Sequence, residues 1–210
     1  MILTRVKICG ITQIEQAVAI SQMRVDALGF ILYPKSPRYI APDKIKPIIN
    51  ALPPFTKTVG VFVNEPAEVI ENIMKVAGLD VAQLSGDEPP ETFQELTVKG
   101  VNWIKTVRIR KEEDLQQLSQ SQYSNHYLLL DAWSKEAYGG TGKTLDWDRL
   151  NLLQDRSRII LAGGLNAENI ATAIRKVRPY GVDLSSGVEI SPGIKSISKV
   201  KALLDSIEAA

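Results

Sequence analysis

The chain has 210 residues, of which 44% are apolar and 23% are charged, and this composition is ordinary for one globular domain. Its 25 Lys and Arg residues and 24 Asp and Glu residues give a formal net charge of +1, which excludes a general electrostatic attraction to nucleic acid or to an anionic membrane. One cysteine, Cys9, and one histidine, His126, exclude an internal disulfide and leave little for a metal site or a Ser-His-Asp triad.

Short runs rich in β-branched residues and leucine alternate along the chain with amphipathic stretches of about ten residues, which is typical of βα units around a parallel sheet. The predicted strands are 5–9, 27–32, 58–63, 81–84, 102–109, 127–132, 158–163 and 181–186. The predicted helices are 14–23, 44–52, 66–78, 90–100, 111–123, 146–154, 167–177 and 196–209. Eight units of about 26 residues are near the lower limit for a closed barrel. We therefore predict that residues 1–210 form a single-domain α/β protein, a (β/α)8 TIM barrel, with an open doubly wound sheet as the alternative.

Several helix ends carry local signals. Thr12 and Glu15 have the spacing of a capping box before the first helix, and Asn166 is a candidate N-cap of the seventh. Gly78 is expected to end the third helix in the C-terminal cap position. Pro47 lies inside the second helix and is expected to kink or shorten it, because proline cannot donate the backbone hydrogen bond.

The first candidate catalytic group is Cys9, the last residue of the first strand. Active sites of such barrels form at the C-terminal ends of the strands. Cys9 is either a small core residue or a reactive thiol whose thiolate is stabilised by Lys7, two residues earlier on the same strand face. Lys7 is equally well explained as a buried cation paired with an acid inside the barrel.

The second candidate is Asp131, which ends the sixth strand after a run of apolar residues. It is either a structural carboxylate that caps a loop or a general acid whose pKa is raised by apolar surroundings. Cys9 and Asp131 would face each other across the barrel, and an isomerase that moves protons requires such a base and acid on opposite sides of its substrate.

The loops after the last two strands are rich in glycine. Gly163 and Gly164 follow the seventh strand, while Ser186 and Gly187 follow the eighth. Glycines let the backbone approach a phosphate, and barrels of this type commonly bind phosphate after strands seven and eight. Either glycine pair alone is explained by a tight turn, but the two together predict a phosphate site.

Two other loops are candidates for substrate contacts. Arg38 lies in a proline-rich loop after the second strand and is either a solvated surface charge or a clamp for a carboxylate. Residues 134–146 form the longest connection and are rich in Gly and Lys, and a connection of this length is usually an active-site loop.

Taken together, these motifs resemble one family. The runs VKICGIT, SPRYI, GVFVN, LLLDAW, GGTGKTLDW, LAGGLNAENI and GVDLSSGVEISPGIKS occur in the order found in phosphoribosylanthranilate isomerases and span nearly the whole chain. The resemblance implies an Amadori rearrangement of N-(5-phosphoribosyl)anthranilate to 1-(2-carboxyphenylamino)-1-deoxyribulose 5-phosphate in tryptophan biosynthesis, without cofactor or metal. It implies that Cys9 is the general base and Asp131 the general acid.

The same resemblance assigns the binding residues. Arg38 corresponds to the residue that contacts the anthranilate carboxylate, and Asp183 lies near the ribose. The phosphate loops contain Gly163, Gly164, Ser186 and Gly187. One position departs from the family, which often has histidine at the end of the fourth strand where this chain has Ser85. We interpret this change as tuning, and whether it broadens specificity toward a related aminoaldose of histidine biosynthesis is left open.

Two other functions compete with this interpretation. Another phosphate-binding barrel enzyme, such as an epimerase or a synthase, would usually need a metal with several histidines, or lysine and glutamate at the strand ends. A non-catalytic barrel would bind a sugar phosphate without turnover. Because the N-terminus lacks a signal peptide and no apolar run can cross a bilayer, we expect a cytoplasmic protein whose partner is a small molecule. A monomer is expected, although a dimer is possible.

Overall fold

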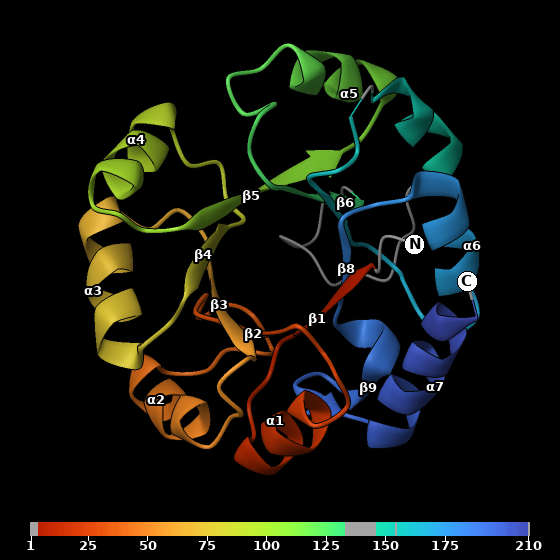
Figure 1. Ribbon diagram of the computed structural model, residues 1–210. Helices are drawn as coiled ribbons and strands as arrows, with labels where there is room; N and C mark the ends of the chain where they lie inside the picture. The colour runs from red at the N-terminus through yellow and green to blue at the C-terminus, as the bar shows by residue number, and fades with distance from the viewer. Residues whose placement is uncertain (1–3, 133–145, 154, 210) are drawn as a thin grey trace.

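The computed structural model describes residues 4–132, 146–153 and 155–209, and within these ranges eight parallel strands form a closed barrel (Figure 1). Strand β1 pairs with β2 on one side and with β8 on the other, so the sheet has no edge. The strands are β1 Arg5–Cys9, β2 Ala27–Ile31, β3 Lys57–Phe62, β4 Val81–Leu84, β5 Trp103–Ile109, β6 Leu128–Ala132, β7 Ile159–Leu161 and β8 Gly181–Leu184. The predicted barrel is confirmed, and closure excludes the open sheet.

A ring of helices surrounds the barrel in Figure 1. The α-helices are α1 Ile14–Ser21, α2 Pro42–Asn50, α3 Ala67–Ala77, α4 Pro90–Val98, α5 Glu112–Ser119, α6 Ile170–Val177 and α7 Ile197–Glu208. Between β6 and β7 the described residues form a 3-10 helix, η1 Trp147–Leu152, where the sequence predicted an α-helix over 146–154. No helix in the described ranges has the length and apolar composition that a membrane crossing requires.

Strand β8 is followed by short elements that the sequence pattern did not predict. A 3-10 turn, η2 Ser186–Val188, leads into an antiparallel hairpin of β9 Glu189–Ser191 and β10 Ile194–Lys195. The predicted eighth strand, 181–186, runs into η2 because the backbone turns immediately after Leu184. The hairpin adds two charged side chains to the end of the barrel where the strands finish.

The helix signals were right in part. Gly78 ends α3 with a left-handed φ of 76°, as predicted. The capping box is wrong, because the Thr12 hydroxyl donates to the carbonyl of Gly193 at 2.6 Å and α1 has no side-chain cap. Helix α2 continues through Pro47 but ends two residues before its predicted end, at Asn50.

Asn166 also acts differently from a simple N-cap. Helix α6 is preceded by Asn169, whereas the Oδ1 atom of Asn166 accepts hydrogen bonds from the backbone N–H groups of Glu168 at 2.9 Å and Asn169 at 3.2 Å. Asn166 therefore caps the turn that leads into α6, one turn earlier than the regular helix begins.

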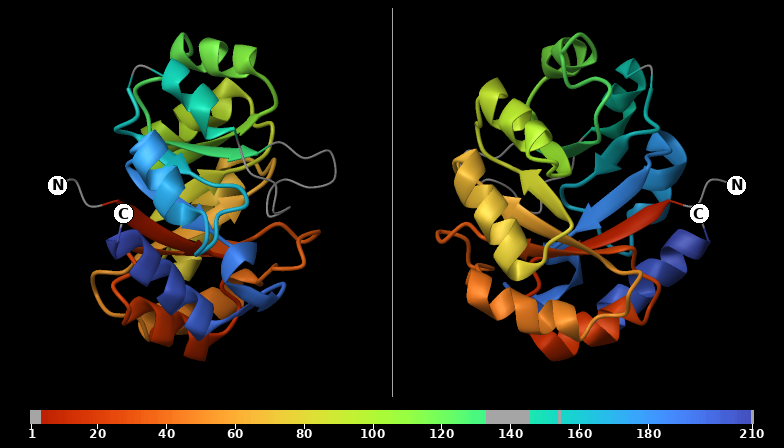
Figure 2. Two further views of the ribbon diagram at one scale, coloured as in Figure 1. Left: turned by 90° about the vertical axis from the view of Figure 1, so that its right-hand side faces the viewer. Right: turned by 60° about the vertical axis from the view of Figure 1, so that its left-hand side comes forward.

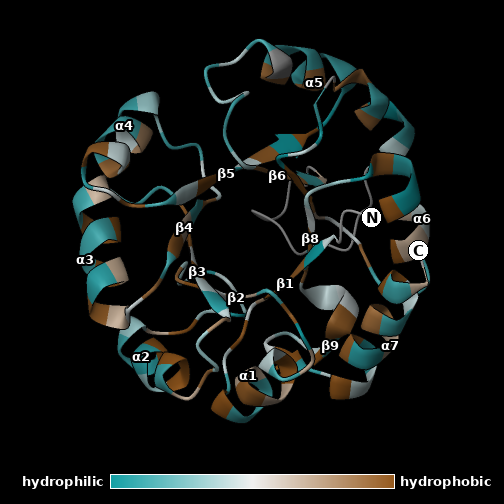
Figure 3. Cartoon of the chain, viewed as in Figure 1, coloured by the Kyte–Doolittle hydropathy of each residue, from teal (hydrophilic) through white to brown (hydrophobic). Residues whose placement is uncertain are grey.

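Apolar side chains form two separate layers. The larger one lies between the barrel and the helices and includes the fully buried Ile8, Phe30 and Phe62. A smaller, separate cluster of Leu129, Ile160 and Ala162, with Ile104 packed against it, lies on the inner face of the strands. In Figure 3 the helices carry both hydrophobic and hydrophilic residues, as expected for elements with one side on the barrel.

The direction of the strands decides where a site can form. Side chains two residues apart on a strand point to the same face. Asp131, two positions after Leu129, and Cys9, two positions after Lys7, therefore point into the barrel at its C-terminal end. Figure 2 shows that β1 begins and α7 ends at the opposite end of the barrel from this mouth.

Candidate active site at the mouth of the barrel

The first part of the site is a pair of charged side chains below Cys9. Lys7 of β1 and Asp183 of β8 lie opposite each other in the strand register, and the Nζ–Oδ1 distance between them is 2.8 Å. Both side chains are buried, with exposed fractions of 6% and 9%. The structure thus bears out the interpretation of Lys7 as a buried cation paired with an acid.

Lys7 is also close to the thiol. A Cβ atom built on Gly29 of β2 would lie 2.8 Å from the Sγ atom of Cys9 and 3.0 Å from the Nζ atom of Lys7. Both side chains therefore end over the same glycine, and only a residue without a side chain leaves them this space. Lys7 therefore fits both interpretations, as a cation paired with an acid and as a cation near the thiol, because its ammonium contacts Asp183 and lies beside Cys9.

The ionisation of Cys9 depends on opposing effects. Burial raises the pKa of the thiol, the ammonium groups of Lys7 and Lys195 lower it, and the carboxylate of Asp183 raises it again. The result is a pKa above the ordinary value. The thiol is therefore the favoured form at neutral pH, which differs from the thiolate that the position of Lys7 alone predicts.

Asp131 lies on β6 and points into the same end of the barrel. Leu129, two residues earlier, packs in the barrel interior, so the half-buried carboxyl of Asp131 is on the inner face. Burial, followed by the negative charge of Asp183, raises the pKa of Asp131 to about 6, against a backbone hydrogen bond at Ala132 and the charge of Arg108. Of the two interpretations offered by the sequence, the raised pKa agrees with the one that makes Asp131 a candidate general acid.

The two glycine-rich loops touch each other. Gly163 and Gly164 after β7 have left-handed φ angles of 85° and 61°. A Cβ atom on Gly187, after β8, would lie 2.0 Å from the carbonyl oxygen of Leu165, so no other residue fits there without moving the backbone. The structure brings the four predicted phosphate-loop residues of β7 and β8 to adjacent loops at the mouth.

Arg38 is not the solvated surface charge that one interpretation proposed. The residue is 8% exposed, and its guanidinium makes a bidentate ion pair with Glu189, with distances of 3.0 Å from Nε to Oε1 and 2.8 Å from Nη2 to Oε2. Lys195 binds the same carboxylate at 2.7 Å. Sequence reasoning missed Glu189 and Lys195, although the charged residues on either side of the Pro-Gly turn in GVEISPGIKS were a signal for a hairpin.

Ser85 lies in a polar cluster inside the barrel wall. Its hydroxyl accepts a hydrogen bond from the Gln83 side chain at 3.1 Å and lies 2.8 Å from the hydroxyl of Thr106. All three residues are buried. The hydroxyl that stands where the family often has histidine is therefore held by neighbouring strands.

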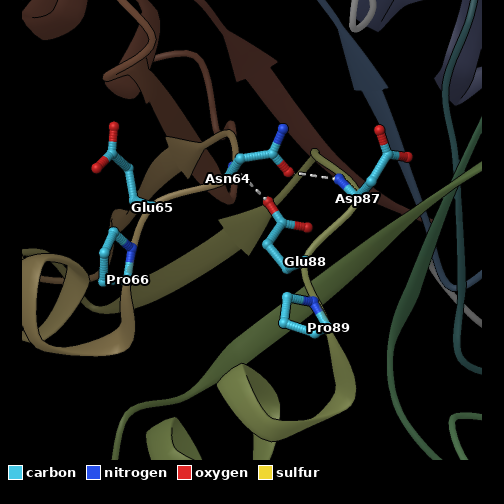
Figure 4. A pocket seen from close by; sticks show the side chains of 6 residues that line it. All are labelled: Asn64, Glu65, Pro66, Asp87, Glu88 and Pro89. Atoms are coloured by element: carbon cyan, nitrogen blue, oxygen red, sulfur yellow. Dashed lines mark hydrogen bonds between the residues drawn. The ribbon is translucent and has the colours of Figure 1, made fainter.

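Figure 4 shows a separate hollow of about 420 Å³ between the loops after β3 and β4. Its lining consists of Asn64, Glu65, Pro66, Asp87, Glu88 and Pro89. The loops are tied together, because Glu88 accepts from the backbone N–H of Asn64 at 3.0 Å and the Asn64 side chain accepts from the N–H of Asp87 at 2.7 Å. Three carboxylates make this hollow unsuitable for a phosphate.

Two further points concern the long loop after β6 and the question of a metal site. Residues 134–145 of the predicted active-site loop lie outside the described residues. Within the described ranges, no group of three His, Cys, Asp or Glu side chains is arranged to hold a metal ion.

Comparison with known proteins agrees along almost the whole chain. The family model described as N-(5'-phosphoribosyl)anthranilate (PRA) isomerase matches residues 6–206. An N-(5'-phosphoribosyl)anthranilate isomerase of Pelobacter propionicus is 47% identical over 95% of this chain and 93% of that protein.

Solved structures agree as well. The phosphoribosyl anthranilate isomerase of Thermotoga maritima superposes with a TM-score of 0.89 and 40% identity, covering 99% of this chain and 100% of that one. A phosphoribosyl anthranilate isomerase in complex with reduced 1-(o-carboxyphenylamino)-1-deoxyribulose 5-phosphate has a TM-score of 0.85 and 38% identity, covering 99% and 100%. The chain therefore belongs to the N-(5'-phosphoribosyl)anthranilate isomerase family and is an isomerase of tryptophan biosynthesis.

Proposed function

We propose that the chain converts N-(5'-phosphoribosyl)anthranilate to 1-(2-carboxyphenylamino)-1-deoxyribulose 5-phosphate, with Asp131 as general acid and Cys9 as general base. The observation that carries the proposal is the contrast between two groups at one barrel mouth. Asp131 has a pKa of about 6 and can hold a proton, while Cys9 lies beside the ammonium of Lys7.

In the first step, Asp131 donates its proton to the ring oxygen of the ribose. The bond between that oxygen and the first sugar carbon breaks, and the lone pair of the anthranilate nitrogen forms a C=N bond, which gives a cationic Schiff base. A carboxyl with a pKa of about 6 is protonated in roughly a tenth of molecules at pH 7, far more than an ordinary aspartic acid.

In the second step, the thiolate of Cys9 removes the proton from the second sugar carbon. The C–H electron pair forms a C=C bond, the C=N electrons return to nitrogen, and the enolamine then tautomerises to the ketone. The positive charge of the Schiff base adds to that of Lys7 and favours the thiolate. The reacting species is therefore the fraction of the protein in which Cys9 is a thiolate while Asp131 is protonated.

The binding groups surround this pair. The glycine loops after β7 and β8, with Gly163, Gly164, Ser186 and Gly187, hold the phosphate through backbone N–H groups. Arg38 binds the anthranilate carboxylate. Asp183 lies near the ribose, as the family resemblance implies, and it also fixes Lys7 through their ion pair.

The reaction needs no cofactor by this mechanism, because every proton and electron pair stays within the substrate and the two side chains. The expectation of a monomer stays a prediction.

The test is a fluorescence assay that follows consumption of N-(5'-phosphoribosyl)anthranilate by the wild type and by the Cys9→Ala and Asp131→Asn variants. General acid or base catalysis contributes about 100- to 10,000-fold, so each variant should lose that much kcat with little change in KM. Binding without turnover by the wild type would support the non-catalytic alternative. Unchanged turnover by Cys9→Ala would refute the assigned base.

A further inference from the structure

A buried triad of charged side chains, Arg38, Glu189 and Lys195, lies beside the proposed active site. The three residues come from the loop after β2, from β9 and from β10, and their side chains expose 10%, 4% and 0% of their surface. We propose that Glu189 is a positioning residue that holds Arg38 so that the outer edge of its guanidinium binds the carboxylate of the substrate. This inference rests on the proposed function, which supplies a substrate with an aromatic carboxylate.

The hydrogen bonds within the triad leave one edge of Arg38 available. A guanidinium has five N–H groups in a planar fork. Glu189 takes the inner edge, with contacts of 3.0 and 3.1 Å to Nε and 2.8 Å to Nη2. The outer edge keeps the two N–H groups of Nη1 and one of Nη2, and none of the described residues bonds to Nη1 through a side chain. This edge has the geometry that a second carboxylate needs for a bidentate contact.

The charges of the triad favour an anionic ligand. Arg38 and Lys195 carry two positive charges and Glu189 one negative charge, so the triad has an excess charge of +1. Burial raises the pKa of Glu189, but hydrogen bonds from Arg38 and Lys195 outweigh it, and the carboxylate stays ionised. An aromatic carboxylate would neutralise the triad, which favours binding in a site with little water.

The position of Arg38 matches this role. Its side chain lies across Gly10, which directly follows Cys9, and a Cβ atom on Gly10 would be 2.8 Å from the Cδ atom of Arg38 and 3.2 Å from the Oγ atom of Ser185. Lys195 approaches the carbonyl and hydroxyl oxygens of Ser185 at 3.4 Å each. The triad therefore lies between the proposed base and the proposed phosphate loop.

Glu189 also fixes the hairpin that carries it. Its Oε1 atom accepts the backbone N–H of Gly193 at 3.1 Å in addition to the bonds from Arg38 and Lys195. With these partners the carboxylate cannot turn without breaking several hydrogen bonds. A side chain held in this way can define the plane of the Arg38 guanidinium before substrate binds.

The test compares two ligands that differ in one group. The first is reduced 1-(o-carboxyphenylamino)-1-deoxyribulose 5-phosphate, and the second is the same compound without the ring carboxyl. Dissociation constants are measured by calorimetry for the wild type and for Glu189→Gln. A charge-assisted hydrogen bond corresponds to about 10- to 100-fold in affinity. We expect Glu189→Gln to lose that factor for the carboxylated ligand and to bind the second ligand as the wild type does.

A kinetic measurement gives an independent readout. The ring carboxylate keeps its bonds and its charge throughout the reaction, so we expect its contact with Arg38 to be similarly strong in the ground state and in the transition state. Glu189→Gln should therefore raise KM for N-(5'-phosphoribosyl)anthranilate by a similar factor while kcat is preserved. In an Arg38→Met background, Glu189→Gln should have no further effect on KM.

Two further variants control for folding. Glu189→Gln leaves two buried cations together and lowers stability for that reason, whereas Glu189→Asp keeps the charge and withdraws the carboxylate from Arg38. Glu189→Asp should show the same selectivity between the two ligands. Glu71→Gln is the matched control, since Glu71 also bridges two lysines, at 2.6 Å each, but on the outer helical layer, and both ligands should bind this variant normally.

Two results would overturn the inference in different ways. If the wild type turns over substrate but both Glu189 variants weaken the two ligands equally, Glu189 is structural and the positioning role is wrong. If the wild type neither binds these ligands nor turns over substrate, the proposed function fails and the inference falls with it.

Discussion

The raised pKa of Asp131 predicts a specific pH profile for kcat/KM. The active form of the free enzyme needs a protonated Asp131, with a pKa of about 6, and a deprotonated Cys9, whose pKa is above its ordinary value. Between these two pKa values the protonated fraction of the acid falls tenfold per pH unit while the thiolate fraction rises tenfold. Their product is constant, so kcat/KM should be flat over this interval.

Outside the interval the rate should fall. Below about pH 6 Asp131 is already protonated, and each further decrease of one pH unit lowers the thiolate fraction of Cys9 tenfold. Above the pKa of Cys9 nearly all of the cysteine is thiolate, and each further increase of one pH unit lowers the protonated fraction of Asp131 tenfold. A free cysteine has a pKa of about 8.5, so the alkaline limb should begin above that value.

The Asp131→Asn variant provides the decisive comparison. Without a titrating acid, its kcat/KM should be about 100- to 10,000-fold lower and should rise tenfold per pH unit up to the pKa of Cys9, with no break near pH 6. The substrate phosphate also titrates near pH 6, but its effect appears in both proteins and is subtracted in the comparison. The assay is substrate fluorescence at constant ionic strength. A break near pH 6 of equal size in wild type and variant would refute the assignment of Asp131.

Three other predictions follow from single features. Gly187→Ala should weaken phosphate binding and destabilise the fold by about 1–3 kcal/mol, because the added Cβ would lie 2.0 Å from the carbonyl oxygen of Leu165. The affinity for inorganic phosphate measures the first effect, and urea unfolding measures the second. Burial raises the pKa of Asp80, but hydrogen bonds from Thr58 and Lys57 outweigh this effect and leave the pKa lowered. The Asp80 carboxylate therefore stabilises the fold above about pH 4, and this contribution is lost as the pH falls through the lowered pKa. The difference in urea midpoint between wild type and Asp80→Asn should shrink over the same pH range. A chelator should leave turnover unchanged, and lost activity that returns with added metal would favour a metal-dependent barrel enzyme.

The barrel was predictable from the sequence because its signal is local and repeated. Each strand is a short apolar run with a turn at each end, and eight such runs determine the topology. The position of Cys9 at the end of β1 and of Asp131 on β6 followed from the same pattern, since strand ends form one mouth. The raised pKa of Asp131 was also foreseeable, because an apolar strand delivers it to a buried place.

The remaining features depend on contacts between distant parts of the chain. Arg38 and Glu189 are 151 positions apart, and no local pattern shows that they meet. Thr12 had the spacing of a cap, but a better acceptor, the carbonyl of Gly193, lies next to it only in the folded chain. Similarly, the pKa of Cys9 depends on how deeply the barrel buries it, and the nearby Lys7 alone indicated the opposite direction.

The mouth of the barrel contains two aspartates whose environments separate their roles. Asp183 has Lys7 at 2.8 Å, whereas Asp131 takes part in no ion pair within the described ranges. Burial raises the pKa of both carboxyls, and for Asp183 the ammonium of Lys7 offsets part of that rise because it favours the ionised form. The negative charge on Asp183 in turn disfavours a second one on Asp131. One ion pair therefore does two things, since it holds a cation beside the thiol that must lose a proton and, together with burial, raises the pKa of the carboxyl that must donate one.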